Sequence, residues 1–470
     1  RQRISTKENN RGSAEEENRE QSLLSDSCIN RPYLPMKVLI VGCGLAGLST
    51  AISLTSKIEN VQIIIVERRS DLESRGATFG LQINGQNALK EIARNTNGDG
   101  ESQVLSKLIQ EGVHIPSSGG YMLPWWSVRD ALLDEVKQMN DRITVHLGMS
   151  IDKVVEEEEG GLLEATFNDS DMVIHDIDLI VGADGVNSHI RTSVLQLQPA
   201  RPTQTYVWRG SVDISTKEEL KHFQDYPIAK FTKFGDAMIQ TYFNFHSHLP
   251  GSMAYVFTVR ANHLPEGITI DIGTTTPIDL IKAYMDQHDV DGHNNNREDN
   301  DDLKEAYELA MLAFTNTHQA SDLTWSSEMA VVDLTNEEIG WGGRGRITLV
   351  GDAAHSLRPA SGLGGSLAFE DAALLGRYLS KCSDSSRNDE EGGDPSVEGQ
   401  LRAFEKVRLP RCKSISNDQS IRSELSYKVG FAEIPKWDQE YRDWINEGID
   451  SPPEPPLSEM IVFTSAGLLS

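Results

Sequence analysis

The sequence predicts an α/β fold in which a β-rich domain interrupts a domain built on a parallel sheet. Two apolar strands near the N-terminus enclose a helical stretch, which is typical of a βαβ unit. Over residues 201–334 the pattern changes to alternating, aromatic-rich stretches, which indicate an antiparallel sheet. A strand followed by a helix returns at residues 346–380, so the parallel-sheet domain is discontinuous along the chain.

The first βαβ unit, residues 36–68, has a Gly-x-Gly-x-x-Gly turn between its first strand and its helix. Gly42 permits the tight turn, and Gly44 has no side chain to keep a pyrophosphate away from the backbone. Gly47 lets the helix pack closely on the strand. A glycine turn alone is a weak signal, but strand, turn and helix in this order favour a dinucleotide site over an ordinary turn.

Two further features complete this unit. The N–H groups of Leu45 and Ala46 open the helix, and we expect them to face an anion. The second strand, residues 61–66, ends in Glu67, at the separation of about 20 residues from the turn that is typical of dinucleotide-binding units. We expect the Glu67 carboxylate to accept hydrogen bonds from ribose hydroxyls.

The remaining elements follow from hydrophobic periodicity. Before the inserted region, helices are predicted near 85–94 and 126–136, and strands at 144–147, 151–155, 162–167, 172–175 and 178–182. Within it, strands are predicted at 206–212, 230–234, 238–245 and 254–259, and helices at 277–287 and 303–314. After it come a strand at 346–352, helices at 366–380 and 399–423, and a Pro-rich tail from 435. The polar runs 289–302 and 383–398 are predicted as loops.

These elements divide the chain into a disordered N-terminal tail, a discontinuous nucleotide-binding domain, an inserted substrate domain and a C-terminal tail. The predicted bounds, in that order, are 1–35, 36–200 with 335–425, 201–334 and 426–470.

Composition excludes several classes of partner. The net charge of −27 disfavours nucleic acid and anionic membrane surfaces, because both need basic protein surface. There is no run of about 18 apolar residues, so no membrane-spanning helix is expected. The four scattered cysteines form no C-x-x-C pair, which favours a reducing compartment, and we expect a cytoplasmic protein.

Two further motifs carry a family resemblance. Asp184-Gly185 lies within residues 182–191, and a Gly-Asp pair opens the long motif at residues 351–372. With the glycine turn, they resemble the group A flavoprotein monooxygenase family of aromatic hydroxylases and related epoxidases, over residues 36–425. The resemblance implies a Rossmann-like FAD-binding domain with an inserted mixed β-sheet substrate domain.

The residues of the third motif suit FAD. Asp352, at a strand end, can accept a hydrogen bond from a ribityl hydroxyl, although a helix N-cap is the alternative. Pro359 stiffens the next loop. Gly362, Gly364 and Gly365 expose N–H groups ahead of a helix, where they can hold the pyrimidine side of an isoalloxazine.

This motif departs from the family at two positions. Many relatives have Gln where this chain has Leu363, and Asn where it has Ser366. Ser366 is still predicted as a cofactor-binding residue. The departures leave the fit to FAD in place but weaken assignment to any one hydroxylase subgroup.

The resemblance assigns three more cofactor residues. Asp184 would serve both FAD and the incoming NAD(P)H, or else be an ordinary residue of a strand-to-turn segment. Arg129 would contact the FAD diphosphate or ribityl chain, with a surface ion pair as the alternative. Arg68 would border the adenosine, or extend into solvent.

Substrate residues are predicted by position. Arg209 would anchor a polar substrate or the flavin peroxide, or else be a paired cation on a sheet face. Tyr242 shares a strand face with Gln240 and would line the pocket, unless it belongs to the core. Arg358 would face the substrate, whereas His355 is predicted to be structural. The histidines are scattered, so no metal site is predicted.

The resemblance implies an oxidoreductase that consumes NADPH or NADH. Hydride passes to FAD, O2 forms a C4a-hydroperoxide, and one oxygen atom enters a small aromatic or olefinic substrate. The alternatives are a flavin-dependent halogenase, a reductase, or a non-catalytic FAD-binding protein. The Trp-x-Trp-x-Ile-Pro signature of halogenases is missing. Oligomeric state is left open.

Overall fold

The computed structural model describes most of the two predicted domains. The described residues are 34–72, 78–93, 102–115, 118–156, 161–168, 170–213, 229–234, 237–243, 252–261, 264, 266–271, 273–287, 304, 307–308, 311, 325–336, 339–358, 362–383, 394–429 and 439–450. Outside them lie residues 1–33, the polar run 289–302, most of the helix predicted at 303–314 and residues 384–393 of the second polar run. The loop predicted at 383–398 was too long, because a helix begins at Val397.

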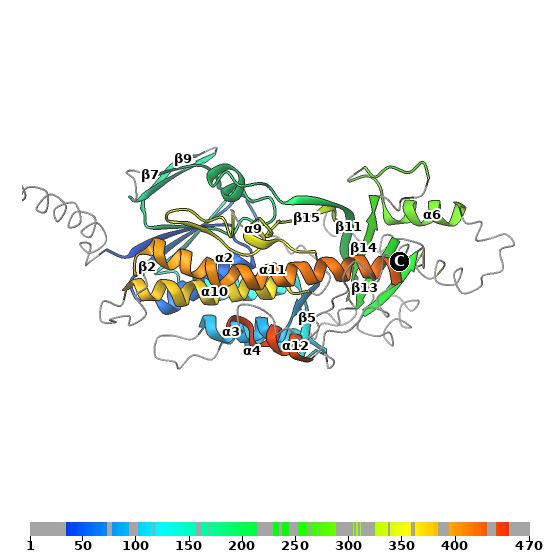
Figure 1. Cartoon of the computed structure of the whole chain (residues 1–470), viewed down its shortest axis with the longest axis horizontal. Coiled ribbons are helices and arrows are strands. Elements are labelled where there is room, and N and C mark those ends of the chain that lie inside the picture. The colour runs from blue at the N-terminus through cyan, green and yellow to red at the C-terminus, as the bar shows by residue number, and fades with distance from the viewer. Residues whose placement is uncertain are drawn as a thin grey trace, which may run out of the picture.

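A five-stranded parallel sheet forms the centre of the molecule (Figure 1). Its order is β16-β10-β1-β2-β6, with every neighbouring pair parallel. The strands are β1 (Met36–Val41), β2 (Val61–Glu67), β6 (Ile143–Leu147), β10 (Leu179–Gly182) and β16 (Ile347–Leu349). The chain runs from β1 to β2 on one side and returns to β10 on the other. Ligands of open α/β sheets bind where strand order reverses in this way, at the carboxyl ends of the strands.

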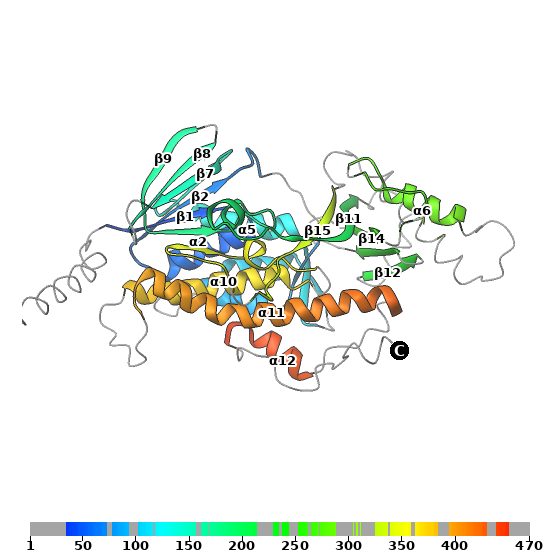
Figure 2. The same cartoon turned by 45° about the horizontal axis from the view of Figure 1, so that its top comes forward.

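Helices cover this sheet. They are α2 (Leu45–Lys57), α3 (Ile83–Ala93), α4 (Gln103–Glu111), α5 (Trp125–Gln138), α10 (Gly364–Leu379) and α11 (Val397–Val429). α2 and α10 are buried along most of their length, because small and branched apolar residues fill both. The long α11 follows α10 and reaches the inserted sheet, where Arg260 donates to the Ser423 carbonyl at 3.3 Å (Figure 2).

Two small antiparallel sheets flank the centre. One is β3 (Thr78–Leu81), β5 (Gly120–Pro124) and β4 (Val113–Ile115), and the other is β7 (Ser150–Glu156), β8 (Leu163–Asn168) and β9 (Ser170–Ile177). The second sheet confirms the hairpin predicted from its alternating pattern. The first was missed, since strands of three to five residues leave too short a pattern to recognise.

The inserted region contains an antiparallel sheet in the order β12-β13-β14-β11-β15. Its strands are β11 (Arg201–Asp213), β12 (Ala229–Phe234), β13 (Ala237–Phe243), β14 (Ser252–Arg260) and β15 (Trp325–Val331). Helix α6 (Pro277–Gln287), as predicted, packs on one face of it. Trp208 lies on that face and donates to the Thr275 carbonyl at 2.9 Å. The opposite face is therefore available to the central domain, and we call this sheet the roof sheet.

The segment predicted as a C-terminal tail contains a helix that sequence reasoning missed. α12 (Gln439–Glu447) is followed by the short turn η5 (Gly448–Asp450). Tyr441, Trp444 and Ile445 are each at most 2% exposed. Among the described helices, none is long and apolar enough to span a membrane.

Candidate functional site

The three sequence motifs meet at the carboxyl ends of β1, β10 and β16. A Cβ atom on Gly42 would lie 2.3 Å from the carbonyl oxygen of Ala183, next to the second motif. A Cβ on Gly351, in the third motif, would lie 2.7 Å from the Cβ of Ala46. Both glycines also have a positive φ, 113° and 60°. Only glycine fits these two positions, so the first motif contacts both of the others.

The glycine turn has the shape expected for a pyrophosphate. A Cβ on Gly47 would lie 2.0 Å from the Gly42 carbonyl oxygen, whereas one on Gly44 would meet nothing within 4 Å. Thus Gly47 closes the turn and Gly44 leaves open space beside it. No side chain caps α2, and its first turn has no acidic residue, so the N–H groups of Leu45 and Ala46 can face an anion.

Glu67 holds this turn from the end of β2. Its carboxylate accepts hydrogen bonds from the N–H groups of Cys43 and Arg69, both at 3.0 Å. A carboxylate has further lone pairs, so these bonds leave capacity for a ribose hydroxyl. Arg68, next in the chain, is exposed.

Arg129 is the fifth residue of α5 and is 3% exposed. Its guanidinium donates to the Leu72 carbonyl at 2.8 Å and pairs with Asp130. Burial and then Glu67 raise the pKa of the Cys43 thiol to about 12, and Arg129 opposes that shift. The positive charge of Arg129 therefore acts on the glycine turn, the place where a diphosphate would need it.

Asp184 organises the second motif. One carboxylate oxygen accepts from the Ser188 hydroxyl, and the other from the N–H groups of His189 and Ile190 at 2.7 and 3.1 Å. Burial raises the pKa of Asp184 in spite of these bonds. The carboxylate thus holds the N–H groups at the start of the short turn η1 (Ile190–Val194), which gives Asp184 a structural role in the segment after β10.

Arg191, which sequence reasoning missed, links the second motif to the third. It is 4% exposed and donates to the carbonyls of Gln198 at 2.8 Å and Ala353 at 3.4 Å. The Ala353 carbonyl lies in α9 (Asp352–His355), directly after the Gly-Asp pair.

Asp352 and Arg209 come together from separate domains. Asp352 begins α9, and Arg209 lies on β11 of the roof sheet. Burial raises the pKa of Asp352, and Arg209 is among the groups that oppose the shift. Burial likewise lowers the pKa of Arg209, and Asp352 opposes it. Asp352 nevertheless keeps access to solvent, so it is open to a ligand.

Backbone register shows which residues of the roof sheet share a face with Arg209. Arg209 pairs with Val256, and Val256 pairs with Gln240, so the three positions form one cross-strand row. Residues opposite one another share a face, and Tyr242, two residues beyond Gln240, has the same parity. Side chains of Gln240 and Tyr242 lie outside the described set, so their part in a pocket stays a prediction. Arg358 is half-buried in the segment after α9.

The glycine loop of the third motif precedes α10, whose start no side chain caps. Gly362 has a φ of 69°, and a Cβ on Gly364 would meet nothing within 4 Å. A Cβ on Gly365 would lie 2.0 Å from a ring carbon of Phe79, which fixes the loop against β3. Ser366 is fully buried, and its hydroxyl has no hydrogen-bond partner among the described residues. Pro359 lies outside them.

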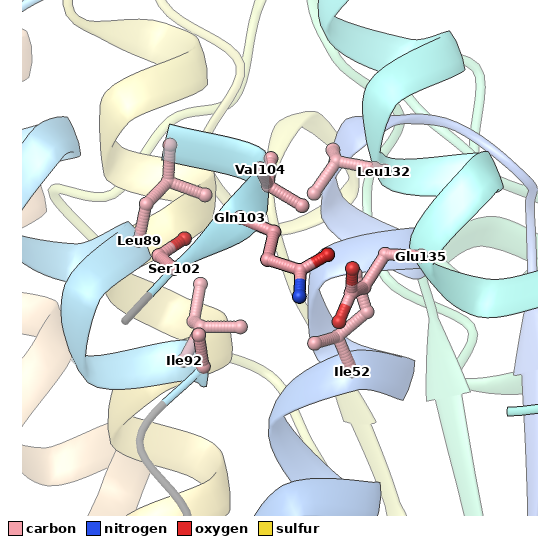
Figure 3. A pocket seen from close by; sticks show the side chains of 9 residues that line it. Ile52, Leu89, Ile92, Ser102, Gln103, Val104, Leu132 and Glu135 are labelled. Carbon is pink, nitrogen blue, oxygen red and sulfur yellow. The ribbon is translucent and has the colours of Figure 1, made fainter. Parts of the chain in front are cut away.

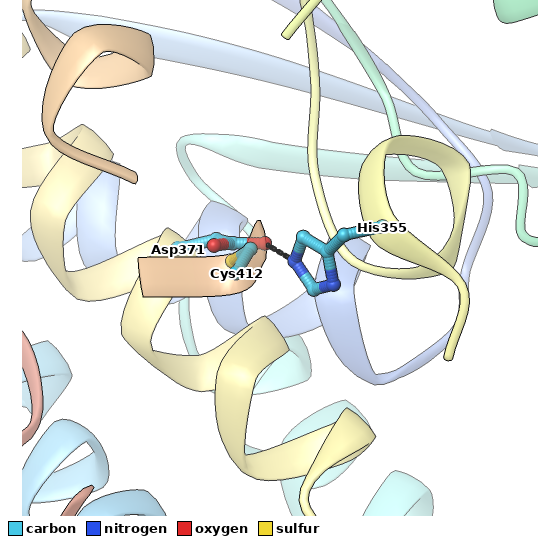
Figure 4. A group of neighbouring side chains, drawn as sticks. All are labelled: His355, Asp371 and Cys412. Atoms are coloured by element: carbon cyan, nitrogen blue, oxygen red, sulfur yellow. Dashed lines mark hydrogen bonds and ion pairs between the residues drawn. The ribbon is translucent and has the colours of Figure 1, made fainter. Parts of the chain in front are cut away.

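A buried polar cluster joins residues of the third motif to α11 (Figure 4). His355 Nε2 lies 2.6 Å from an Asp371 oxygen that also accepts from the Gly351 N–H at 2.8 Å. Arg408 on α11 donates to the other Asp371 oxygen at 2.7 Å and to Cys412 Sγ at 3.4 Å. His355 is fully buried in this cluster, and the structural role expected for it in spite of its suggestive position stays a prediction.

The same cluster has the composition of a metal site, which the sequence did not predict. Ligand atoms of His355, Asp371 and Cys412 lie within 4.8 Å of one another. Burial raises the pKa of the Cys412 thiol to about 12, and Arg408 already supplies the positive charge. A neutral thiol beside a guanidinium is a poor cation ligand, so we interpret the cluster as a structural support.

A shallow crevice lies elsewhere, among α2, α3, α4 and α5 (Figure 3). Its lining is mostly apolar, and burial raises the pKa of Glu135, at its edge. None of its lining residues belongs to the three motifs, and it is too small for a dinucleotide.

Comparison with known proteins agrees with this geometry. Residues 121–390 match the sequence profile of the family described as FAD binding domain. The chain is 27% identical over 354 residues to the 2-heptyl-3-hydroxy-4(1H)-quinolone synthase of Pseudomonas aeruginosa, covering 73% of this chain and 80% of that protein. It is 23% identical over 440 residues to the FAD-dependent urate hydroxylase of Klebsiella pneumoniae, covering 88% and 96%.

Solved structures show the same fold. CtdE in complex with FAD and a substrate superposes with a TM-score of 0.62 at 14% identity, covering 85% of this chain and 90% of that chain. Klebsiella pneumoniae HpxO in complex with FAD and uric acid superposes with a TM-score of 0.57 at 18% identity, covering 89% and 97%. The predicted α/β class is thereby confirmed.

Proposed function

Because this chain belongs to the FAD binding domain family and is an FAD-dependent monooxygenase, we propose that it uses NAD(P)H and O2 to insert one oxygen atom into a small aromatic or olefinic substrate. The convergence of the three motifs beneath the roof sheet carries this proposal. We place the dinucleotide along these three motifs.

The residues of the three motifs and their neighbours supply hydrogen-bond donors and acceptors that fit FAD. Glu67 and Arg68 would border the adenosine, and the start of α2 with Arg129 would bind the diphosphate. Asp352 and Asp184 would bind the ribityl chain, and the loop Gly362–Gly365 with Ser366 would hold the isoalloxazine. The empty space beside Gly44 and Gly364 is the structural feature that a bound dinucleotide would occupy.

When bound, FAD supplies hydride acceptance from NAD(P)H and activation of O2 as the C4a-hydroperoxide. The residues of the chain supply charge and position. N–H groups at the uncapped start of α10 stabilise negative charge at the pyrimidine side of the ring. The roof sheet excludes water from the reaction.

Arg209 supports a substrate that carries an acidic or strongly polar oxygen. Arg209 lies on the roof sheet, and its positive charge is partly balanced by Asp352 of the third motif. By their names, one relative hydroxylates urate and another makes a 3-hydroxyquinolone, and both compounds are planar rings with polar oxygens. We therefore propose a planar aromatic substrate that Arg209 orients by a charge-assisted hydrogen bond.

The test begins with the visible spectrum of the purified protein, followed by NADPH or NADH addition with an oxygen electrode in place. Oxidised-flavin bands that bleach and then recover with O2 uptake are expected. A panel of aromatic acids and heteroaromatic compounds should then contain one that accelerates NAD(P)H oxidation and gains one oxygen atom from labelled O2. Reduction of a substrate without O2 uptake would favour a reductase, and a protein that takes up no FAD would contradict the proposal.

A further inference from the structure

We propose that α12 is a strap that holds the flavin-facing loop Gly362–Gly365 in its binding shape, with Arg411 as the positioning residue that locks it. This inference rests on the placement of FAD proposed above. It assigns a role to a C-terminal helix that belongs to none of the three motifs.

Apolar contact joins the strap to the loop. Leu363 lies inside the loop, directly before Gly364, and is 1% exposed. The surrounding cluster combines residues of α10, α11 and α12, namely Leu367, Ile415, Tyr441, Trp444 and Ile445. A large apolar side chain at position 363 thus has its cover supplied by the strap. Without α12, Leu363 would lose part of this apolar cover at the point where the loop joins the helix.

Arg411 fastens the end of the strap to α10. Its guanidinium binds both oxygens of Glu370, with two contacts of 2.7 Å. It also donates to the carbonyls of Trp444 at 3.2 Å and Ile445 at 2.9 Å, and it lies 4.7 Å from the Trp444 ring centroid. Those carbonyls belong to the last turn of α12, where a helix leaves them without internal partners. One buried cation therefore caps the strap and anchors it to the helix that begins at the loop.

Two contacts to α3 complete the attachment. Asn84 donates to Glu370 at 2.7 Å, and Asn87 donates to the Asn446 carbonyl at 3.0 Å. Burial alone would raise the pKa of Glu370, but Arg411 and Arg408 hold it below its ordinary value. Glu370 is therefore charged, and its bonds to Arg411 give the strap one defined position rather than a loose apolar contact.

The consequence concerns the direction of the loop N–H groups. Phe79 fixes Gly365 from one side, and the strap covers Leu363 from the other. If the strap is detached, Leu363 loses its pocket and the N–H groups of Gly364 and Gly365 are no longer held toward the flavin. FAD affinity and the flavin reduction potential should both fall, because these donors favour the anionic reduced ring.

The experiment compares wild-type protein with Trp444→Ala as full chains, well below the unfolding temperature. The FAD dissociation constant is measured by quenching of flavin fluorescence, and the reduction potential by dye equilibration. Trp444→Ala should raise the dissociation constant about tenfold and lower the potential, with the circular dichroism of the folded protein retained. Tyr284→Ala is the matched control, since it truncates a buried aromatic residue of α6 in the roof-sheet cluster. It should leave both flavin measurements unchanged.

Arg411→Lys is the second variant and covers the case in which Trp444→Ala does not fold. Lysine keeps the positive charge beside Glu370 but cannot bind both of its oxygens and cap α12 at once. It should shift both flavin measurements in the same direction by a smaller factor. If either folded variant keeps the wild-type dissociation constant and potential, the strap is overturned while the proposed function stands. If wild-type protein binds no FAD, the proposed function fails first.

Discussion

The glycine turn at residues 42–47 and the glycine loop at residues 362–365 both present backbone N–H groups, but different contacts hold them in shape. Each presents N–H groups from a helix start that no side chain caps. The first is shaped by its own backbone, because Gly47 and Gly42 leave no room for a Cβ between them. The second depends on side chains from β3 and α12 that pack against it. A binding loop can therefore take its shape from its own residues or from distant segments that pack on it. Mutations should change stability and FAD binding differently in the two cases.

The largest effect on stability is expected from Arg408→Met, in the buried polar cluster that contains Asp371 of the third motif. Arg408 is 1% exposed and pairs with Glu370 at 2.8 Å and Asp371 at 2.7 Å, so its loss leaves two buried carboxylates short of positive charge. We expect the free energy of unfolding to fall by about 3–5 kcal/mol, measured by urea denaturation. Exposed Lys137→Met is the control and should change stability little. A loss of less than about 1 kcal/mol would show that distant charges do not support this motif.

The next effect separates two glycines of the first motif. Gly47→Ala places a methyl group against the Gly42 carbonyl, and we expect it to lower the free energy of unfolding by about 3 kcal/mol. Gly44→Ala meets no protein atom, so its fold should survive while FAD binding weakens. Thermal melting without FAD and fluorescence titration with FAD measure the two effects. Equal loss of stability in both variants would contradict a turn shaped by the Gly47 contact alone.

A smaller effect is expected where the two domains meet. Asp352→Asn should raise the FAD dissociation constant by about tenfold, because one ribityl acceptor becomes a neutral amide. Arg209→Gln should slow substrate oxygenation and leave FAD binding nearly intact. The double variant measures their coupling, which should differ from additivity by about 1 kcal/mol. Strict additivity in both assays would mean that the Arg209–Asp352 attraction has no functional consequence.

The smallest expected effect is on the pH dependence of stability. It distinguishes a loop held by distant residues, as at 362–365, from a turn shaped by its own backbone, as at 42–47. Glu370 and Asp371 have folded-state pKa values below their ordinary ones, held there by their cationic neighbours. Their stabilising contribution is complete above the unfolded values of 4.5 and 3.8 and is lost as pH falls through the lower folded values. The melting temperature should therefore decline below about pH 4.5, and Glu370→Gln should flatten part of that decline. A decline of equal slope in Glu370→Gln would locate the acid sensitivity elsewhere.

Much of the architecture was predictable from short patterns. The βαβ unit at residues 36–68 was correct in its strands, helix and turn, because glycine spacing and apolar runs act over a few residues. Four strands of the roof sheet were also predicted from their alternation, whereas β15 was missed. The other missed elements are short, and elements of this length depend on packing more than on local pattern; they are β3, β4, β5, α4 and α12. Domain bounds and the roles of individual site residues stay predictions.

The sequence by itself determined the α/β class, the glycine turn and the three motifs, since each depends on residue types at fixed short spacings. Only the tertiary structure decided that Arg209 faces Asp352, that Arg191 joins two motifs and that α12 covers Leu363. Glu370 and Arg411 are neighbours in space but lie on different helices, and no local pattern relates them. Such pairs form because a buried charge must find a partner, and the partner is chosen by how whole helices pack.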